Sequence, residues 1–185
     1  MEFLPTDLQG VWRVKTAPHG DDRGQFARLY CPDEFADAGI DFAPTQINLS
    51  TNTQSHTLRG MHFQKAPYAE AKLVRAIQGR AWDVAVDLRP GPDFGRWISA
   101  DLASPMDALY LPEGVAHGFL TLEPDTHILY QMGRSFVPGH GDGLCWDDPD
   151  LAIEWPAEPR IIADKDRAWR PLSERTDLTE TGETP

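Results

Sequence analysis

The chain of 185 residues has few cysteines, comparatively little positive charge and no long apolar run. Its two cysteines, Cys31 and Cys145, are far apart and match no CxxC pattern, so they predict reduced thiols and favour a cytoplasmic protein. Lys and Arg total 17 against 29 Asp and Glu, which gives a net charge of −12. This charge disfavours binding to nucleic acid or acidic membrane surfaces, so any anionic ligand must be held by a local group of basic residues.

The lack of a long apolar run also excludes a membrane-spanning helix. The first seven residues lack the basic start and apolar run of a signal peptide, so we expect a soluble protein that is not exported. A hydrophobic content of 41% and six tryptophans suit one globular domain with a substantial core, and we expect it to cover residues 1–172. Residues 173–185 are polar and rich in Thr and Glu, which predicts a loose tail.

Most of the chain shows the two-residue alternation of β-strands. In the best example, residues 81–88, one face carries Trp82, Val84, Val86 and Leu88, and the other carries Asp83, Ala85 and Asp87. Pro/Gly turn signals at 89–92, 104–105, 111–114 and 138–141 divide the middle of the chain into short strands. One short helix is predicted from Pro32 to a stop at Gly39. We therefore expect a mainly β sandwich or barrel with a few short helices.

The segment from Leu58 to Gln64 and the nearby Lys72 concentrate groups that can do chemistry. His62 can accept a proton near neutral pH, and the cations Arg59 and Lys72 can hold an anionic substrate or an enolate. Strict alternation sets Arg59 and His62 on opposite faces of the strand. Both can serve one cavity only if the strand bulges or twists, for which Gly60 is a plausible place.

Three further segments carry polar groups, and each has an ordinary structural interpretation. Gln46, Asn48 and Ser50 share one face of a strand, which fits a solvated outer face. His117 follows a Pro/Gly turn and alone suggests a structural histidine. Tyr130 shares a strand face with Ile128, which is typical of a core tyrosine with a satisfied hydroxyl.

Taken together and in order, the motifs resemble a known family. They are Gly20-Asp21-Asp22-Arg23-Gly24, Leu58-Arg59-Gly60-Met61-His62-Phe63-Gln64, Lys72-Leu73-Val74, residues 82–89, Pro112-Glu113-Gly114 with Ala116-His117-Gly118-Phe119, Leu129-Tyr130, Trp146-Asp147-Asp148-Pro149, Trp155-Pro156 and Lys165-Asp166. In this respect, from about residue 3 to about residue 172, the chain is similar to the dTDP-4-dehydrorhamnose 3,5-epimerases, a branch of the cupin jelly rolls. The resemblance implies a cupin-type jelly roll.

The resemblance also implies a reaction and catalytic residues. Such an enzyme inverts C3 and C5 of a nucleotide-linked 4-keto-6-deoxyhexose, because the ketone acidifies both C–H bonds and proton loss gives an enolate. By resemblance, His62 is the base, Asp166 orients it and stabilises its imidazolium, Tyr130 is the acid on the opposite face, and Lys72 stabilises the enolate. No cofactor and no metal are implied.

Other matching positions imply substrate binding. In relatives these positions contact the sugar, diphosphate or nucleotide, and here they are Arg23, Gln46, Asn48, Arg59, His117 and Lys165, besides Lys72. For Arg23 and Lys165 a surface ion pair is the alternative. The resemblance further implies a homodimer with strands shared across the interface.

The chain departs from the common family pattern at several positions. Arg28 and Gly141 stand where glutamates are common, and Ser135 and Phe136 replace aromatic residues that commonly follow the catalytic tyrosine. These departures leave the nucleotide, the sugar and the choice between one inversion and two open. We expect a preferred substrate that need not be the dTDP-rhamnose precursor.

Two other functions compete with this prediction. A metal-dependent cupin would have His62, Glu70 and His117 as candidate ligands, but Gln64 replaces a strong imidazole ligand. A non-catalytic sugar-nucleotide binder would need the cleft but not a proton acceptor and donor, so the presence of His62, Tyr130 and Asp166 speaks against it.

Overall fold

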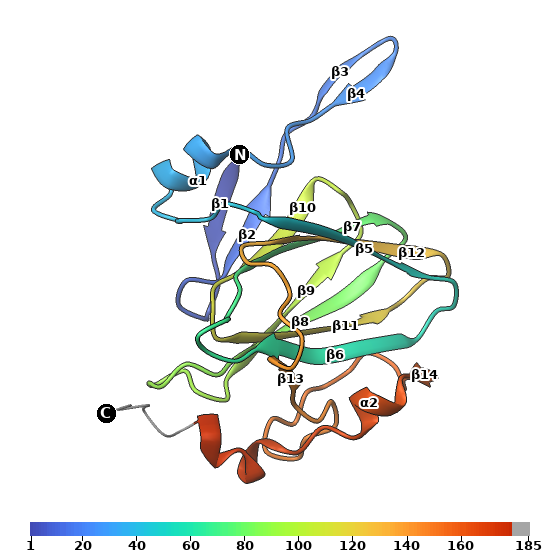
Figure 1. Cartoon of the computed structure of the whole chain (residues 1–185). Helices are drawn as coiled ribbons and strands as arrows, with labels where there is room; N and C mark the ends of the chain where they lie inside the picture. The colour runs from blue at the N-terminus through green and yellow to red at the C-terminus, as the bar shows by residue number, and fades with distance from the viewer. Residues whose placement is uncertain (179–185) are drawn as a thin grey trace.

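The computed structural model of the protein describes residues 1–178 and shows a sandwich of two β-sheets (Figure 1). The first, here called the β5 sheet, has the strand order β1-β2-β10-β7-β12-β5. The second, the β6 sheet, has the order β13-β6-β11-β8-β9, with β14 parallel beside β6. The other pairings are antiparallel, so the expected mainly β, jelly-roll architecture is confirmed.

The strands and helices are short, as the frequent turn signals predict. The strands are β1 Glu2–Pro5, β2 Trp12–Lys15, β3 His19–Asp21, β4 Gly24–Phe26, β5 Gln46–Asn52, β6 Thr57–Gln64, β7 Lys72–Gln78, β8 Ala81–Asp87, β9 Trp97–Leu102, β10 Asp107–Leu111, β11 Val115–Thr121, β12 Thr126–Met132, β13 Gly141–Gly143 and β14 Ile161–Ile162. The helices are α1 Pro32–Asp37 and α2 Asp164–Arg167, with 3₁₀ turns η1 Leu172–Glu174 and η2 Thr176–Leu178. The helix expected at Pro32 is confirmed, with the proline in its first turn.

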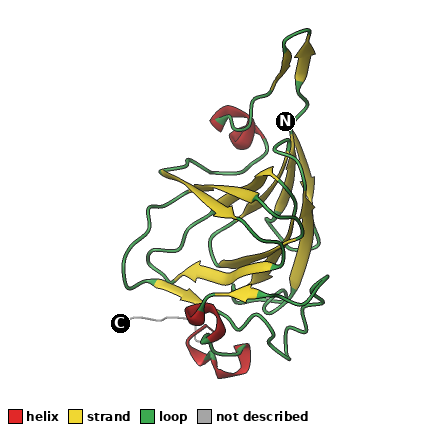
Figure 2. Cartoon of the chain, turned by 90° about the vertical axis from the view of Figure 1, so that its right-hand side faces the viewer, coloured by secondary structure: helices red, strands yellow, loops and turns green. Residues whose placement is uncertain are grey.

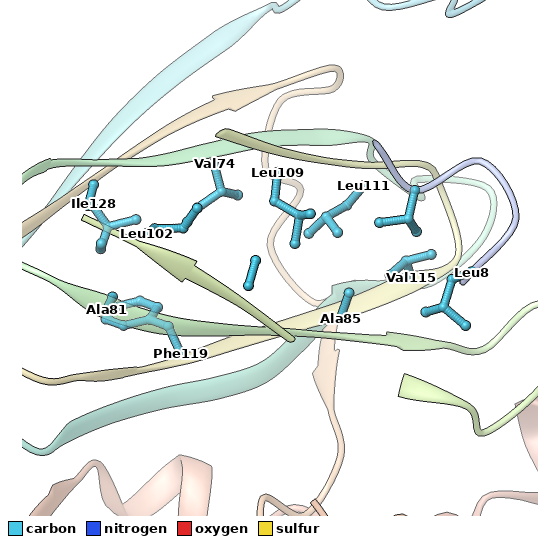
Figure 3. Close-up of a cluster of buried hydrophobic side chains, with 13 residues drawn as sticks. Leu8, Val74, Ala81, Ala85, Leu102, Leu109, Leu111, Val115, Phe119 and Ile128 are labelled. Carbon is cyan, nitrogen blue, oxygen red and sulfur yellow. The ribbon is translucent and has the colours of Figure 1, made fainter. Parts of the chain in front are cut away.

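Apolar side chains from both sheets form the core between them (Figure 3). Val74, Leu109 and Ile128 come from the β5 sheet and meet Ala85 and Phe119 of the β6 sheet. Burying one such leucine or phenylalanine contributes roughly 1.5–3 kcal/mol, so this layer is a main source of stability. Tyr130 packs against its edge, which sets the apolar core directly beside the polar cavity described below.

Both faces of β8 are covered, which explains its strict alternation. Ala85 faces the core between the sheets, whereas Val84 and Val86 pack beneath the C-terminal part of the chain. Trp82 belongs to the same outer cluster as Val84. The predicted division of this strand into two faces is confirmed.

Gly60 lies at a bulge between β6 and β11. The register pairs His62 with His117 and Arg59 with Phe119, so two residues of β6 oppose Gly118 alone. Gly60 has a φ of +152°, and a Cβ there would come within 2.7 Å of the Cα of Gly118. Only glycine fits this close approach. The bulge expected at Gly60 is therefore confirmed.

The hairpin of β3 and β4 projects away from the sandwich, beyond α1 (Figures 1 and 2). Its tip carries Arg23, and Phe26 near its base is 77% exposed. Among residues 1–178 no helix is long and apolar enough to cross a membrane. Cys31 and Cys145 are free, as expected, but half-buried.

The expectation of a loose tail from residue 173 is wrong for residues 173–178, and residues 179–185 lie outside the described part of the chain. Arg175 is only 1% exposed and forms ion pairs with Asp142, at 2.8 Å, and Asp177, at 2.9 Å. Its guanidinium also lies over the ring of Phe63. A polar composition concealed this anchor because its partner Asp142 is distant in sequence.

Candidate active site

A cavity of about 550 Å³ opens between the sheets. Its walls combine residues of the β5 sheet, the β6 sheet and α2. They include Asn48, Ser50, Lys72, Tyr130 and Met132 from the first sheet, Arg59, His62, Gln64, His117 and Gly141 from the second, and Glu70, Phe136, Lys165 and Trp169 from loops and α2. The bulge at Gly60 lets both Arg59 and His62 reach this cavity.

His62 and Asp166 form a paired acid and base at the cavity wall. The Nε2 atom of His62 lies 2.7 Å from Oδ1 of Asp166, although the residues are 104 positions apart in sequence. Asp166 lies in α2 with 2% of its side chain exposed, and its Oδ2 accepts a hydrogen bond from the backbone N–H of Gly60. The imidazole is 35% exposed. The carboxylate is therefore fixed from two sides, and the ring can meet a ligand.

The surroundings shift the pKa values of both partners. Burial lowers the pKa of His62 because it disfavours the imidazolium, although Asp166 opposes this effect. Lys165 and Lys72 also lower the pKa of His62. Burial acts to raise the pKa of Asp166, but the bond with His62 and the Gly60 amide outweigh it and lower that pKa. The pair thus rests as neutral imidazole and carboxylate at neutral pH, the form that accepts a proton.

Lys72 is buried in the opposite sheet yet reaches across to β6. Its Nζ donates to the backbone carbonyl of His62 at 2.9 Å and lies 3.1 Å from Oε1 of Glu70. Burial lowers the pKa of Lys72, and the carboxylates of Glu70 and Asp83 oppose that shift. A cation thus lies beside the base, where negative charge on a ligand would be stabilised.

Tyr130 is partly buried at the cavity wall on β12. Burial and the nearby Asp83 raise its pKa, so the hydroxyl stays protonated over a wide pH range. Among the described residues the hydroxyl has no hydrogen-bond partner. Tyr130 packs against the core, as the sequence predicts, but no partner for its hydroxyl is found within residues 1–178.

His117 forms a second histidine–aspartate pair. It lies opposite His62 on β11, and its Nε2 is 2.8 Å from Oδ2 of Asp83. Their side chains are only 5% and 0% exposed. Burial raises the pKa of Asp83, and its Oδ1 has no partner among residues 1–178.

Several predicted binding residues also line the cavity. Asn48, Arg59 and Lys165 do so directly, and Arg59 donates its Nε–H to Asn52 at 2.8 Å. Gln46 lies beside them, donating to Asn48 at 2.9 Å and accepting from the backbone N–H of Phe136. The strand face of Asn48 and Ser50 therefore borders the cavity instead of lying fully in solvent.

Arg23, unlike Gln46 and Asp166, neither lines the cavity nor bonds a residue that lines it. It lies at the tip of the β3–β4 hairpin, pairs with Asp21 at 2.5 Å and has 90% of its side chain exposed. Arg28, one of the departures, lies nearby and pairs with Glu34 at 3.0 Å. Gly141 and Phe136, two further departures, do line the cavity.

Sequence reasoning missed part of the site. Asp83 was placed on its strand face without a role, and Glu70 was considered only as a metal ligand. An aspartate on the inward face of an otherwise buried strand was the available signal for Asp83, because a buried carboxylate requires a partner. Nothing in the sequence indicated Trp169, whose indole lies 6.5 Å from the ring of His62.

The geometry does not assemble a metal centre. Among residues 1–178, no three His, Cys, Asp or Glu side chains are grouped so that they could hold a metal ion. The three candidate ligands have other partners: His62 bonds Asp166, His117 bonds Asp83 and Glu70 pairs with Lys72.

The fold and cavity define a cupin-type jelly-roll enzyme with a histidine–aspartate pair facing a tyrosine and a lysine. A family model, dTDP-4-dehydrorhamnose 3,5-epimerase, matches residues 5–174, and the chain belongs to this family of isomerases. The chain is 38% identical over 177 residues to the dTDP-4-dehydrorhamnose 3,5-epimerase of Sinorhizobium fredii, covering 94% of this chain and 91% of that one.

Solved structures agree with this membership. The crystal structure of the dTDP-4-dehydrorhamnose 3,5-epimerase from Bacillus anthracis, with TDP and PPi bound, matches with a TM-score of 0.89 and 36% identity over 92% of this chain and 99% of that one. A 3'-monoepimerase from Streptomyces bikiniensis in complex with dTDP-quinovose matches with a TM-score of 0.87 and 31% identity, over 94% and 90% of the two chains. The family thus includes relatives described as acting at two centres and at one.

Proposed function

We propose that the protein inverts C3 and C5 of a dTDP-linked 4-keto-6-deoxyhexose, converting dTDP-4-dehydro-6-deoxy-D-glucose to dTDP-4-dehydro-L-rhamnose without a metal or cofactor. The observation that carries the proposal is that the two proton-transfer groups come from opposite sheets. His62 comes from the β6 sheet and Tyr130 from the β5 sheet, and both line the same cavity. A sugar ring between the sheets would present one face to each group.

In the proposed mechanism, His62 removes the proton beside the C4 ketone and Asp166 stabilises the imidazolium that forms. The electron pair moves onto the C4 oxygen as an enolate, which the Lys72 ammonium stabilises. Tyr130 then donates its hydroxyl proton from the opposite face, which inverts the carbon. The same groups serve the second centre after the ring has been repositioned and the two side chains have exchanged protons with solvent.

The anionic part of the substrate would be bound at the cavity margin. Arg59 and Lys165 supply positive charge there, Asn48 and Gln46 supply amide groups, and His117 lines the wall with its Nε2 bonded to Asp83. This local cluster answers the difficulty raised by the net charge of −12. The two free thiols are consistent with a cytoplasmic site for the reaction.

A homodimer would explain the position of Arg23. The projecting hairpin and the edge strand β5 both expose apolar side chains, with Phe26 77%, Ile47 63% and Leu49 54% exposed. A second copy seated on β5 would cover these residues and let the hairpin of one subunit deliver Arg23 to the cavity of the other.

Inversion at C3 alone is the second candidate. Gly141 leaves a carboxylate-free position in the cavity wall and Phe136 lies at its margin with 59% exposure, so two of the departures named in the sequence border the cavity. For the same reason the preferred substrate need not be the dTDP-rhamnose precursor. Equal or better turnover of that precursor would count against this prediction.

Incubation with several 4-ketosugar nucleotides in deuterated water tests the proposal. Deuterium at both C3 and C5 is expected, detected by NMR. Deuterium at C3 alone would identify a mono-epimerase, whereas exchange at neither position would remove the epimerase proposal. Activity should survive a chelator, and stoichiometric metal whose removal abolishes activity would favour the metal-dependent alternative.

A further inference from the structure

Glu70 and Lys72 form a buried ion pair in the cavity wall. Their side chains are only 4% and 5% exposed, and Nζ of Lys72 lies 3.1 Å from Oε1 of Glu70. A second donor of the ammonium is used by the carbonyl of His62 at 2.9 Å. An ammonium has three donors, and the part of the chain that the structure describes uses two of them, so one N–H is left for a ligand in the cavity.

The second carboxylate oxygen of Glu70 shows that the role of its negative charge can be considered separately from its hydrogen bond to Lys72. Oε2 is buried and has no hydrogen-bond partner among residues 1–178. A neutral amide oxygen in place of Oε1 would accept the same bond from Lys72 without burying a charge, which is costly. The hydrogen bond to Lys72 therefore does not explain why residue 70 is a carboxylate. The negative charge of the side chain does.

We propose that Glu70 is a positioning residue that keeps the Lys72 ammonium charged inside the cavity wall and directs its third N–H at the substrate. This inference rests on the proposed function, in which Lys72 stabilises the enolate. It goes further by assigning to Glu70 the control of how far into alkaline pH the enzyme remains active.

Other charged and titratable groups also face Lys72. Asp83 of β8 acts on Lys72 by charge and Lys72 acts on His62 of β6, whereas His117 of β11, Tyr130 of β12 and Lys165 of α2 line the same cavity. Burial lowers the pKa of Lys72, and Glu70 opposes this by charge and by hydrogen bonding, whereas Asp83 acts by charge only. Asp83 is already paired with His117. Glu70 is thus the carboxylate in direct contact with the ammonium.

The test compares Glu70→Gln with the wild-type protein over a full pH profile of deuterium exchange. Removing a negative charge in contact with Lys72 lowers the pKa of the ammonium, so activity should be lost at lower pH on the alkaline side. We expect this limb to move down by about one pH unit or more. Glu70→Asp should restore the limb, and Glu158→Gln, an exposed change of equal charge, should leave it unmoved.

A direct titration of Lys72 separates this inference from the proposed function. The sequence contains only the lysines Lys15, Lys65, Lys72 and Lys165, so labelled lysine signals can be assigned with Lys72→Arg. A lower pKa of Lys72 in Glu70→Gln supports the inference even if no 4-ketosugar is a substrate. An unchanged Lys72 titration would overturn it. If Glu70→Gln does not fold, Glu70→Asn against Glu70→Asp repeats the same comparison.

Discussion

Two histidine–aspartate pairs lie side by side in this protein, and their surroundings differ. His62–Asp166 and His117–Asp83 have nearly equal separations, 2.7 and 2.8 Å, and the two histidines are cross-strand partners. His62 is 35% exposed to the cavity and His117 only 5%. The pKa of Asp166 is lowered, whereas burial raises that of Asp83. Equal residue types at equal distance therefore do not imply equal roles.

The difference follows from what else each carboxylate contacts. Asp166 also accepts the Gly60 amide and lies near Lys165, which favours its charged form and so stabilises an imidazolium on His62. Within the described residues 1–178, Oδ1 of Asp83 has no hydrogen-bond partner, and the side chain has no exposed surface. We therefore propose proton transfer for the first pair and a fixed, ligand-orienting role for the second.

The largest effect should come from replacing the base. His62→Asn should lower deuterium exchange at C3 and C5 by about 10²–10⁴-fold, because general base catalysis contributes that much. Binding of dTDP, measured by calorimetry, should change little. The matched variant His117→Asn should weaken binding while retaining most of the exchange rate, and a loss as large as that of His62→Asn would erase the distinction between the pairs.

A smaller loss is expected for Asp166→Asn, about 10²-fold in exchange, because the base loses its orienting carboxylate. In the wild type, activity needs neutral His62 and should fall as pH drops through a pKa below the ordinary value of 6.5, since burial lowers it. Asp166 raises the pKa of His62, so this acid limb should move to still lower pH in the variant. The pH profile of kcat/KM measures both, and an acid limb that stays in place would contradict the assignment.

The smallest effect is on the free energy of unfolding. Here the His117–Asp83 pair should matter more than the His62–Asp166 pair. Asp83→Ala leaves a buried His117 nitrogen without a partner and should lower the free energy of unfolding by about 1–3 kcal/mol. Asp166→Ala should cost less, because water can reach the partly exposed His62. Urea denaturation of both variants measures this difference, and equal losses would show that burial does not separate the pairs.

Local features of the sequence predicted much of the fold. The alternation of residues 81–88 predicted both faces of β8, and Pro32 and Gly39 predicted α1. Strict alternation sets Arg59 and His62 on opposite strand faces, and their shared cavity therefore predicted a bulge at Gly60. Each of these features depends on near neighbours in the chain.

Features that depend on distant partners were not predicted from the residues alone. The composition around Arg175 suggested a loose tail because its partner Asp142 lies 33 positions earlier. Asp166 was matched to His62 only through the family resemblance, and the pairing of Glu70 with Lys72 was missed although two positions separate them. Both side chains of that pair are buried, and the alternation of residue types along the chain does not reveal this burial.

The separate roles proposed for His62 as base and Tyr130 as acid are tested most directly by Tyr130→Phe in deuterated water. The partly exposed His62 can still remove a proton and return deuterium to the same face, whereas the hydroxyl that donates a proton from the opposite face is gone. We predict that exchange into the starting sugar continues while formation of the inverted sugar falls by about 10²-fold or more. Inversion at the wild-type rate, or exchange lost as fully as inversion, would contradict a site with its base on one sheet and its acid on the other.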